Sequence, residues 1–200
     1  MKKITSAGFI ALTLCFGFAC DGTKEDSVEQ AQETNEQKFE DTAREERKDD
    51  QSEFMTKAAS GGMMEVELGK MAQEKAQTQE VKDFGAMMVK DHSAANEELK
   101  QLAAQKNITL PDSMSEGHMD HVKELREKTG MDFDKAYMSL MVEDHQEDVE
   151  MFEEAANNMQ DADVKAFASK TVTTLRQHLD KAKQVKEKVD NMKDNATTKK

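Results

Sequence analysis

Tryptophan is absent from this 200-residue chain, tyrosine occurs once, and aromatic residues make up only 5% of the sequence. This scarcity excludes an aromatic platform for stacking nucleic-acid bases, and it argues against an all-β sandwich. Proline occurs once and glycine nine times, so turn signals are few and the elements are expected to be long. The abundant residues are alanine, glutamate, lysine, glutamine and methionine, which favour helices.

Cysteine is equally scarce, and both cysteines lie within the first twenty residues. The body of the protein therefore forms no disulfide bond and no thiolate metal site. The formal net charge of -13 argues against a nucleic-acid partner, because a phosphate backbone requires a basic surface. A glycine-rich phosphate loop, a Gly-x-Ser-x-Gly elbow and a cysteine nucleophile are all missing, so no sequence motif identifies an enzyme.

The N-terminus has the pattern of an export signal. Lys2 and Lys3 precede an apolar run over residues 7–19, which is too short for a comfortable membrane span. The run ends in Ala19-Cys20, and a small residue before a cysteine at this place resembles the lipobox of bacterial lipoproteins. We expect residues 1–19 to be removed and Cys20 to carry lipid that anchors the protein to a membrane. The alternative is an ordinary secreted protein with an incidental cysteine.

Residues 20–52 are predicted to be an acidic tether, either disordered or a loose helix. Residues 21–52 contain twelve Asp or Glu against five Lys or Arg, and their only large apolar side chains are Val28 and Phe39. Such a segment buries too little apolar surface to offset the entropy lost on ordering. Residues 193–200 are expected to form a disordered tail.

The remaining residues, 53–192, show apolar stripes at helical spacing. Four long helices are predicted at about 53–77, 79–106, 132–158 and 161–191, with a shorter helical piece over residues 114–128. The short connections within the first and last pairs indicate two antiparallel hairpins, and the longer middle connection indicates a crossover. The predicted fold is therefore all-α, a ferritin-like four-helix bundle with a short crossover helix.

Four polar residues interrupt the apolar stripes, one on each long helix: Glu65, His92, His145 and His178. A polar group on a buried stripe is costly unless it has a partner. Glu65 lies 13 residues before the first hairpin turn near Thr78, and His92 lies 14 residues after it, so the two are level. His145 and His178 are offset about the second turn by about 4.5 Å, given a rise of 1.5 Å per residue. We expect the four side chains to converge midway along the bundle.

Three imidazoles and a carboxylate suit a transition-metal ion such as Fe, Zn, Mn or Cu. Asp91 and Asp144 each precede a histidine of the set, and are expected to accept a hydrogen bond from an imidazole N–H or to add a ligand. The alternative is a metal-free network in which Glu65 accepts hydrogen bonds from the imidazoles. The Glu-x-x-His signature of ferritin-type di-iron sites is absent, which disfavours that chemistry.

Five segments in a fixed order resemble the bacterial domain-of-unknown-function family numbered 4142, whose members are often described as outer-membrane proteins. They are Ala59–Val66, Met88–His92, Phe133–Tyr137, Val142–His145 and Thr174–Leu179. The resemblance implies a ferritin-like fold, and the family's motif positions include Glu65, His92, His145 and His178. It implies a fold more directly than a function.

Three functions stay open. The first is a lipid-anchored envelope protein of a Gram-negative bacterium, placed at the periplasmic or surface face of the outer membrane, that binds a metal for storage, sensing or redox protection. The second is a metal-free structural or partner-binding module, whose partner is a second copy of the chain or another protein. The third is a metal-dependent oxidase or peroxide-consuming enzyme.

Overall fold

The computed structural model describes residues 26–40 and 45–192, and within them it contains six helices and no strand. The helices are α1 (Ser27–Phe39), α2 (Glu45–Lys75), α3 (Gln79–Lys106), α4 (Glu116–Glu127), α5 (Gly130–Asn158) and α6 (Ala162–Asn191). The predicted all-α class is thus confirmed. The signal peptide at 1–19, the lipidated Cys20 and the tail at 193–200 lie outside the described residues.

The connections follow from local sequence. The side chain of Ser115 accepts a hydrogen bond from the backbone N–H of His118 at the start of α4, and Asp161 accepts bonds from two backbone N–H groups at the start of α6. Asn107 ends α3 in the left-handed conformation, with φ of 59°. The buried carboxylate of Asp134 accepts bonds of 2.8 Å from the N–H groups of Gln77 and Thr78, so α5 caps the α2–α3 turn.

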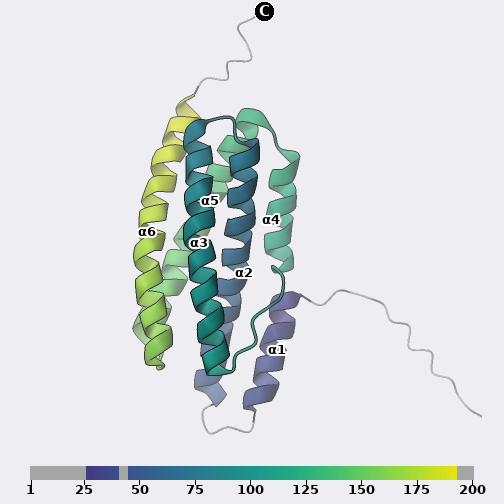
Figure 1. Cartoon of the computed structure of the whole chain (residues 1–200), viewed down its shortest axis with the longest axis vertical. Coiled ribbons are helices and arrows are strands. Elements are labelled where there is room, and N and C mark those ends of the chain that lie inside the picture. The colour runs from purple at the N-terminus through teal and green to yellow at the C-terminus, as the bar shows by residue number, and fades with distance from the viewer. Residues whose placement is uncertain (1–25, 41–44, 193–200) are drawn as a thin grey trace, which may run out of the picture.

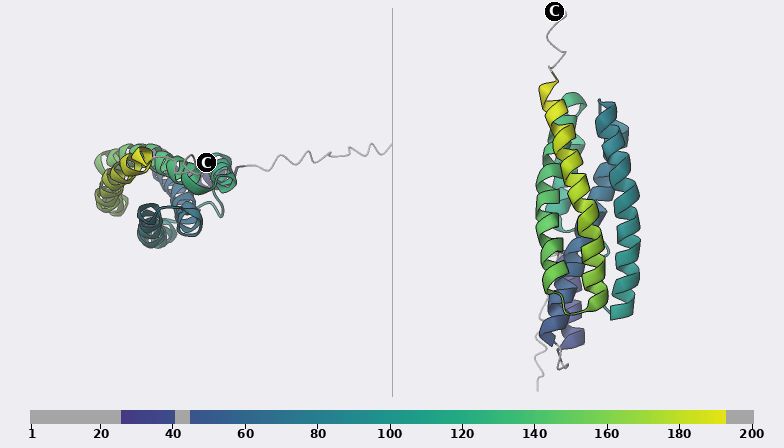
Figure 2. Two further views of the ribbon diagram at one scale, coloured as in Figure 1. Left: turned by 90° about the horizontal axis from the view of Figure 1, so that it is seen from above. Right: turned by 90° about the vertical axis from the view of Figure 1, so that its left-hand side faces the viewer.

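The four long helices lie side by side as two hairpins. α2 pairs with α3 and α5 pairs with α6, and the hairpins meet where α2 contacts α5 and α3 contacts α6 (Figure 1). Between the hairpins the chain returns along the molecule through α4, which packs beside α2. The two further views show the long helices nearly parallel to the long axis, with α1 and α4 on the α2 side (Figure 2).

The prediction of a disordered tether is wrong for residues 27–39 and 45–52, which are helical. Tertiary contacts supply the stability that composition lacks. The side chain of Asn35 donates a bond of 2.9 Å to the carbonyl of Thr109 and accepts one of 2.7 Å from its N–H. The side chain of Asp26 accepts a bond of 2.6 Å from the N–H of Glu116, and the ring of Phe39 is buried. The helical domain therefore begins well before residue 53.

The core consists of two apolar clusters with one layer of polar side chains between them, formed by Glu65, His92, His145 and His178. One cluster gathers residues such as Met64, Phe84, Met141 and Val185, and the other gathers residues such as Phe54, Leu99, Phe152 and Leu175. On every long helix a residue of the predicted polar set lies between the two clusters or at their border. The polar layer is therefore enclosed by apolar packing on both sides.

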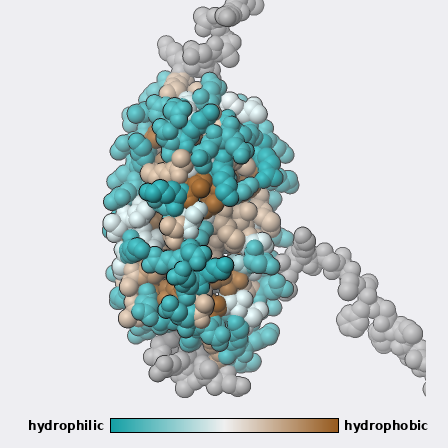
Figure 3. All heavy atoms as spheres, in the orientation of Figure 1, coloured by the Kyte–Doolittle hydropathy of each residue, from teal (hydrophilic) through white to brown (hydrophobic). Residues whose placement is uncertain are grey.

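The face of the molecule shown in Figure 3 is largely hydrophilic, with small and scattered apolar areas. Met119 is the large hydrophobic side chain exposed among the described residues. In the same residues, no helix combines the length and apolar character that crossing a membrane requires.

Candidate metal centre

The structure brings together the four polar residues singled out by their spacing. Glu65 comes from α2, His92 from α3, His145 from α5 and His178 from α6, and each is at most 6% exposed. The three imidazole rings have centroids 5.2–5.6 Å apart. One nitrogen from each imidazole lies within 4.8 Å of the other two, a spacing at which the three can share one ion. We call these four residues the polar layer.

Glu65 is the shared acceptor of the polar layer. Its Oε2 lies 2.6 Å from Nδ1 of His92, in a hydrogen bond between the two hairpin helices. Its Oε1 lies 3.4 Å from Nε2 of His145 without forming a hydrogen bond. The carboxylate thus links α2 to α3 and faces α5 with its other oxygen.

His178 connects the polar layer to Asp91. Its Nε2 lies 3.1 Å from Oδ2 of Asp91, and its Nδ1 lies 3.2 Å from Nε2 of His92. A carboxylate that accepts the N–H of one imidazole nitrogen orients the ring and leaves the other nitrogen as a donor for a metal. Asp91 therefore occupies the position expected of it from sequence.

Asp144 lies farther from its neighbouring histidine than Asp91 lies from His178. Its Oδ2 lies 3.9 Å from Nδ1 of His145, too far for a hydrogen bond, whereas burial, the neighbouring carboxylates and a hydrogen bond with Glu65 raise its pKa well above the usual value. The ring of His145 is fully buried, and neither of its nitrogens forms a hydrogen bond of good geometry, although the backbone of Met141 lies close enough to raise its pKa. Asp144, His145 and Glu65 present ligand atoms within 4.8 Å of one another, so Asp144 is placed to add a ligand.

The electrostatics of the polar layer follow from burial and mutual contact. Burial alone raises the pKa of Glu65, but the charges of the histidines and the hydrogen bond from His92 outweigh it and hold the pKa below its usual value. Burial lowers the pKa of His92, and Glu65 more than compensates, so that pKa is raised. Burial lowers the pKa of His145 to about 4 and also lowers that of His178. Near neutral pH the last two are neutral imidazoles, the form that binds metal.

Sequence reasoning missed three polar residues close to this layer. Asp148 lies three residues after His145 and has its pKa raised well above the usual value by burial and by the charge of Glu65. Asn96 lies one turn after His92, and both Asn96 and Asp148 line a small cavity with Glu65. The hydroxyl of Tyr137, two turns before Asp144, is buried without a hydrogen-bond partner. The sequence signal for these residues was helical spacing. Asp148 is three residues from His145, Asn96 is four from His92, and Tyr137 is seven from Asp144.

The other two histidines lie on α4, and neither belongs to the three-histidine group. Nδ1 of His118 lies 2.7 Å from Oγ of Ser60, and Ser60 also accepts a bond of 2.9 Å from the N–H of Ser115. The hydroxyl of Ser60 thus contacts both Ser115 and His118 and ties α4 to α2. His121 is exposed.

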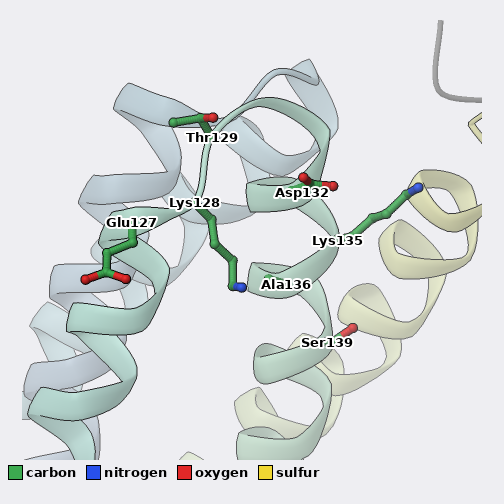
Figure 4. A pocket seen from close by; sticks show the side chains of 7 residues that line it. All are labelled: Glu127, Lys128, Thr129, Asp132, Lys135, Ala136 and Ser139. Carbon is green, nitrogen blue, oxygen red and sulfur yellow. The ribbon is translucent and has the colours of Figure 1, made fainter. Parts of the chain in front are cut away.

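A larger depression of about 540 Å³ lies at the connection between α4 and α5 (Figure 4). Its lining includes Glu127, Lys128, Asp132 and Ser139, and it shares no residue with the polar layer. His145 lies six residues beyond Ser139 along α5, about 9 Å at the rise of a helix. The polar layer and this depression are separate features of the molecule.

A family model described as a domain of unknown function, DUF4142, matches residues 35–185. The match spans more than half of the chain. The chain belongs to the DUF4142 family.

The DUF4142 match begins within α1 and ends within α6, so it includes the whole polar layer and the α4 crossover. The match also includes part of the segment predicted to be a tether, which agrees with the helical structure of α1. No curated protein and no solved structure matches the chain. The residues and their geometry therefore carry the functional argument.

Proposed function

We propose that this DUF4142 protein binds one transition-metal ion between its four long helices, through Glu65, His92, His145 and His178. We further propose that these helices form a ferritin-like bundle and that lipid on Cys20 anchors it in the envelope of a Gram-negative bacterium, at the outer membrane. Anchoring through Cys20 is consistent with the largely hydrophilic face shown in Figure 3, and no described helix is long and apolar enough to cross a membrane.

The observation that carries the metal proposal is the close approach of His145 to Glu65 inside the core. The ring is fully buried, its contact with the backbone of Met141 falls short of good hydrogen-bond geometry, and Oε1 of Glu65 lies 3.4 Å from its Nε2 without a hydrogen bond between them. A cation between Nε2 of His145 and Oε1 of Glu65 would satisfy those two atoms together, whereas Nδ1 lies on the opposite side of the ring and would not contact the same ion. Burial also keeps His145 neutral, so the ion would not have to displace a proton from it.

The types of the ligand atoms indicate which class of metal the site would bind. Three imidazole nitrogens and one carboxylate oxygen suit Fe, Zn, Mn or Cu, whereas Mg and Ca prefer oxygen ligands alone. Asp91 would hold the ring of His178, and Asp144 stands close enough to join the set. Such a centre would serve metal storage, metal sensing or protection of the envelope against redox stress.

A metal-free network is the second candidate, and one observation favours it. Hydrogen bonds already join Glu65 to His92, His92 to His178, and His178 to Asp91. These bonds satisfy part of the polar layer without an ion, as a structural module would require. They do not include His145, which is why the metal site is preferred.

The test is to purify the full chain from bacteria without a histidine tag and to quantify all first-row metals by mass spectrometry. We expect about one ion per chain in the wild type and none in the double variant His92→Ala, His145→Ala. His121→Ala, which removes an exposed histidine outside the polar layer, should keep its metal. The absence of metal in all three proteins, with no uptake on titration and no shift in melting temperature, would leave the metal-free network.

A further inference from the structure

A small cavity lies against one side of the polar layer, enclosed by all four long helices. Its volume is about 20 Å³, enough for a single water molecule, which requires roughly 10–15 Å³. Glu65 and His92 form part of its wall. The cavity therefore places free space beside two of the proposed metal ligands.

The lining of the cavity is divided by polarity. Polar side chains come from Glu65, His92, Asn96 and Asp148, all near the polar layer. The other side of the wall is mostly apolar, formed by residues such as Leu99, Phe152, Phe167 and Leu175. A purely apolar void stays dry, whereas a void with several polar partners holds a small polar molecule.

The polar end of the cavity depends on one glycine. A Cβ atom on Gly62 would lie 2.0 Å from Oδ1 of Asn96, so the amide of Asn96 occupies the space that a side chain at position 62 would fill. Asn96 lies one turn from His92 on α3 and reaches across to α2. The bare Gly62 thus allows an amide group to lie at the edge of the cavity.

We infer that this cavity is the binding position of a small neutral ligand on the metal, with water in the resting state and a diatomic gas such as dioxygen or nitric oxide in its place. This inference rests on the proposed metal centre and adds a coordination position to it. The volume is that of about one water-sized molecule, and larger substrates exceed it. The apolar wall favours an uncharged ligand, and the side chain of Asn96 adds an amide to the lining.

Nitric oxide is the probe, because its adduct with ferrous iron has a characteristic half-integer-spin EPR signal. The full chain is loaded with Fe(II) without oxygen, its metal content is measured, and nitric oxide is added. If Fe(II) does not bind, Co(II) replaces it; its nitrosyl adduct has an even number of electrons, so binding of nitric oxide is then measured as loss of the half-integer-spin EPR signal of Co(II). The double variant His92→Ala, His145→Ala measures any signal from adventitious iron.

Two neighbouring alanines of α2 provide a matched pair. Ala58 lines the cavity and Ala59 does not, and both are 7% exposed within the same apolar cluster. Ala58→Val should keep its metal and bind nitric oxide about tenfold more weakly or worse, because the added methyl groups fill the space. Ala59→Val should bind nitric oxide as the wild type does. If Ala58→Val does not fold, Thr171→Leu fills the same cavity from α6.

The outcomes separate this inference from the proposed function. A metal-loaded wild type that gives no nitrosyl adduct, or an Ala58→Val protein that binds nitric oxide like Ala59→Val, would overturn the ligand position and leave the metal centre standing. A wild type that binds neither Fe(II) nor Co(II) would overturn both.

Discussion

Gly69 of α2 and Gly85 of α3 face each other at the closest approach of the two helices. A Cβ atom on Gly69 would lie 2.8 Å from the carbonyl oxygen of Gly85, and one on Gly85 would lie 2.7 Å from that of Gly69. Both obstacles are backbone atoms, which cannot move aside as a flexible side chain can. Glu65 lies one turn from Gly69 and His92 two turns from Gly85, so this contact helps set the 2.6 Å approach of their side chains.

Gly85→Ala is expected to destabilise the protein by about 1–2 kcal/mol, since overpacking costs 1–3 kcal/mol and the gain in helix propensity returns up to about 1 kcal/mol. Urea unfolding followed by circular dichroism measures the change. Gly117→Ala on α4 is the control, because a Cβ there meets nothing within 4 Å and should stabilise slightly. Equal stabilisation by both substitutions would contradict the close helix contact.

Asp134→Ala is expected to lower the free energy of unfolding by about 3 kcal/mol, because two backbone N–H groups of the α2–α3 turn lose a charged acceptor. Asp132→Ala, which alters an exposed carboxylate two residues away, should change it by less than about 0.5 kcal/mol. Denaturant unfolding at neutral pH compares the two variants. If their effects were alike, the cap on the turn would have no energetic importance.

The pH dependence of stability follows from His145. In the unfolded chain its pKa is 6.5, and in the folded protein burial lowers it to about 4. Between these values the unfolded state binds a proton that the folded state does not, so the free energy of unfolding falls as pH falls. The loss over this window is roughly 3 kcal/mol, at 1.36 kcal/mol for each pKa unit. The pKa of His178 is lowered too and acts in the same direction.

The contribution of His145 is isolated by comparing metal-free wild type with His145→Gln. Asp144 and Asp148 have raised pKa values, so their contribution to stability is lost as pH rises above the unfolded value of 3.8, opposite in sign to that of His145. These groups are present in both proteins. The wild type should therefore lose its stability advantage over the variant between pH 6.5 and about 4. A difference that stays constant across that range would show that the pKa of His145 is not lowered.

Asp91→Ala is expected to weaken metal binding about 10–100-fold, because it removes the acceptor that orients the ring of His178. Competition with a chromophoric chelator measures the affinity. Asp83→Ala on the same helix is the control, since the carboxylate of Asp83 contacts Gln79 at the surface and not the polar layer. An unchanged affinity in Asp91→Ala would assign Asp91 to the protein surface alone.

The meeting of Glu65 with His92 could be predicted because it depends on local rules. Two helices joined by a short turn have residues level with each other when they are equally far from that turn, and the rise per residue is constant. The same counting brought His145 near His178 with a small offset. The identity of the interrupting residues, three histidines and one glutamate on otherwise apolar stripes, then indicated where a polar layer would lie.

Other parts of the site could not be predicted in this way. Asp148 belongs to an acidic run with Glu147 and Glu150, and nothing in the run shows which carboxylate faces Glu65. Asn96 reaches the site only because Gly62, on another helix, has no side chain. Helix α1 is ordered by Asn35, whose partner Thr109 lies more than seventy residues away. Each case depends on a contact between distant segments.

The amino-acid sequence by itself determined the all-α class, the extents of α3, α5 and α6 to within two residues, and the four residues of the polar layer, because periodicity, turn position and residue type are local properties. Only the tertiary structure decided that α1 is folded, that Nε2 of His145 lies 3.4 Å from Oε1 of Glu65 without a hydrogen bond between them, and that a cavity of about 20 Å³ adjoins Glu65 and His92. These depend on which surfaces exclude water and which atoms meet across helices, and no single stretch of chain contains that information.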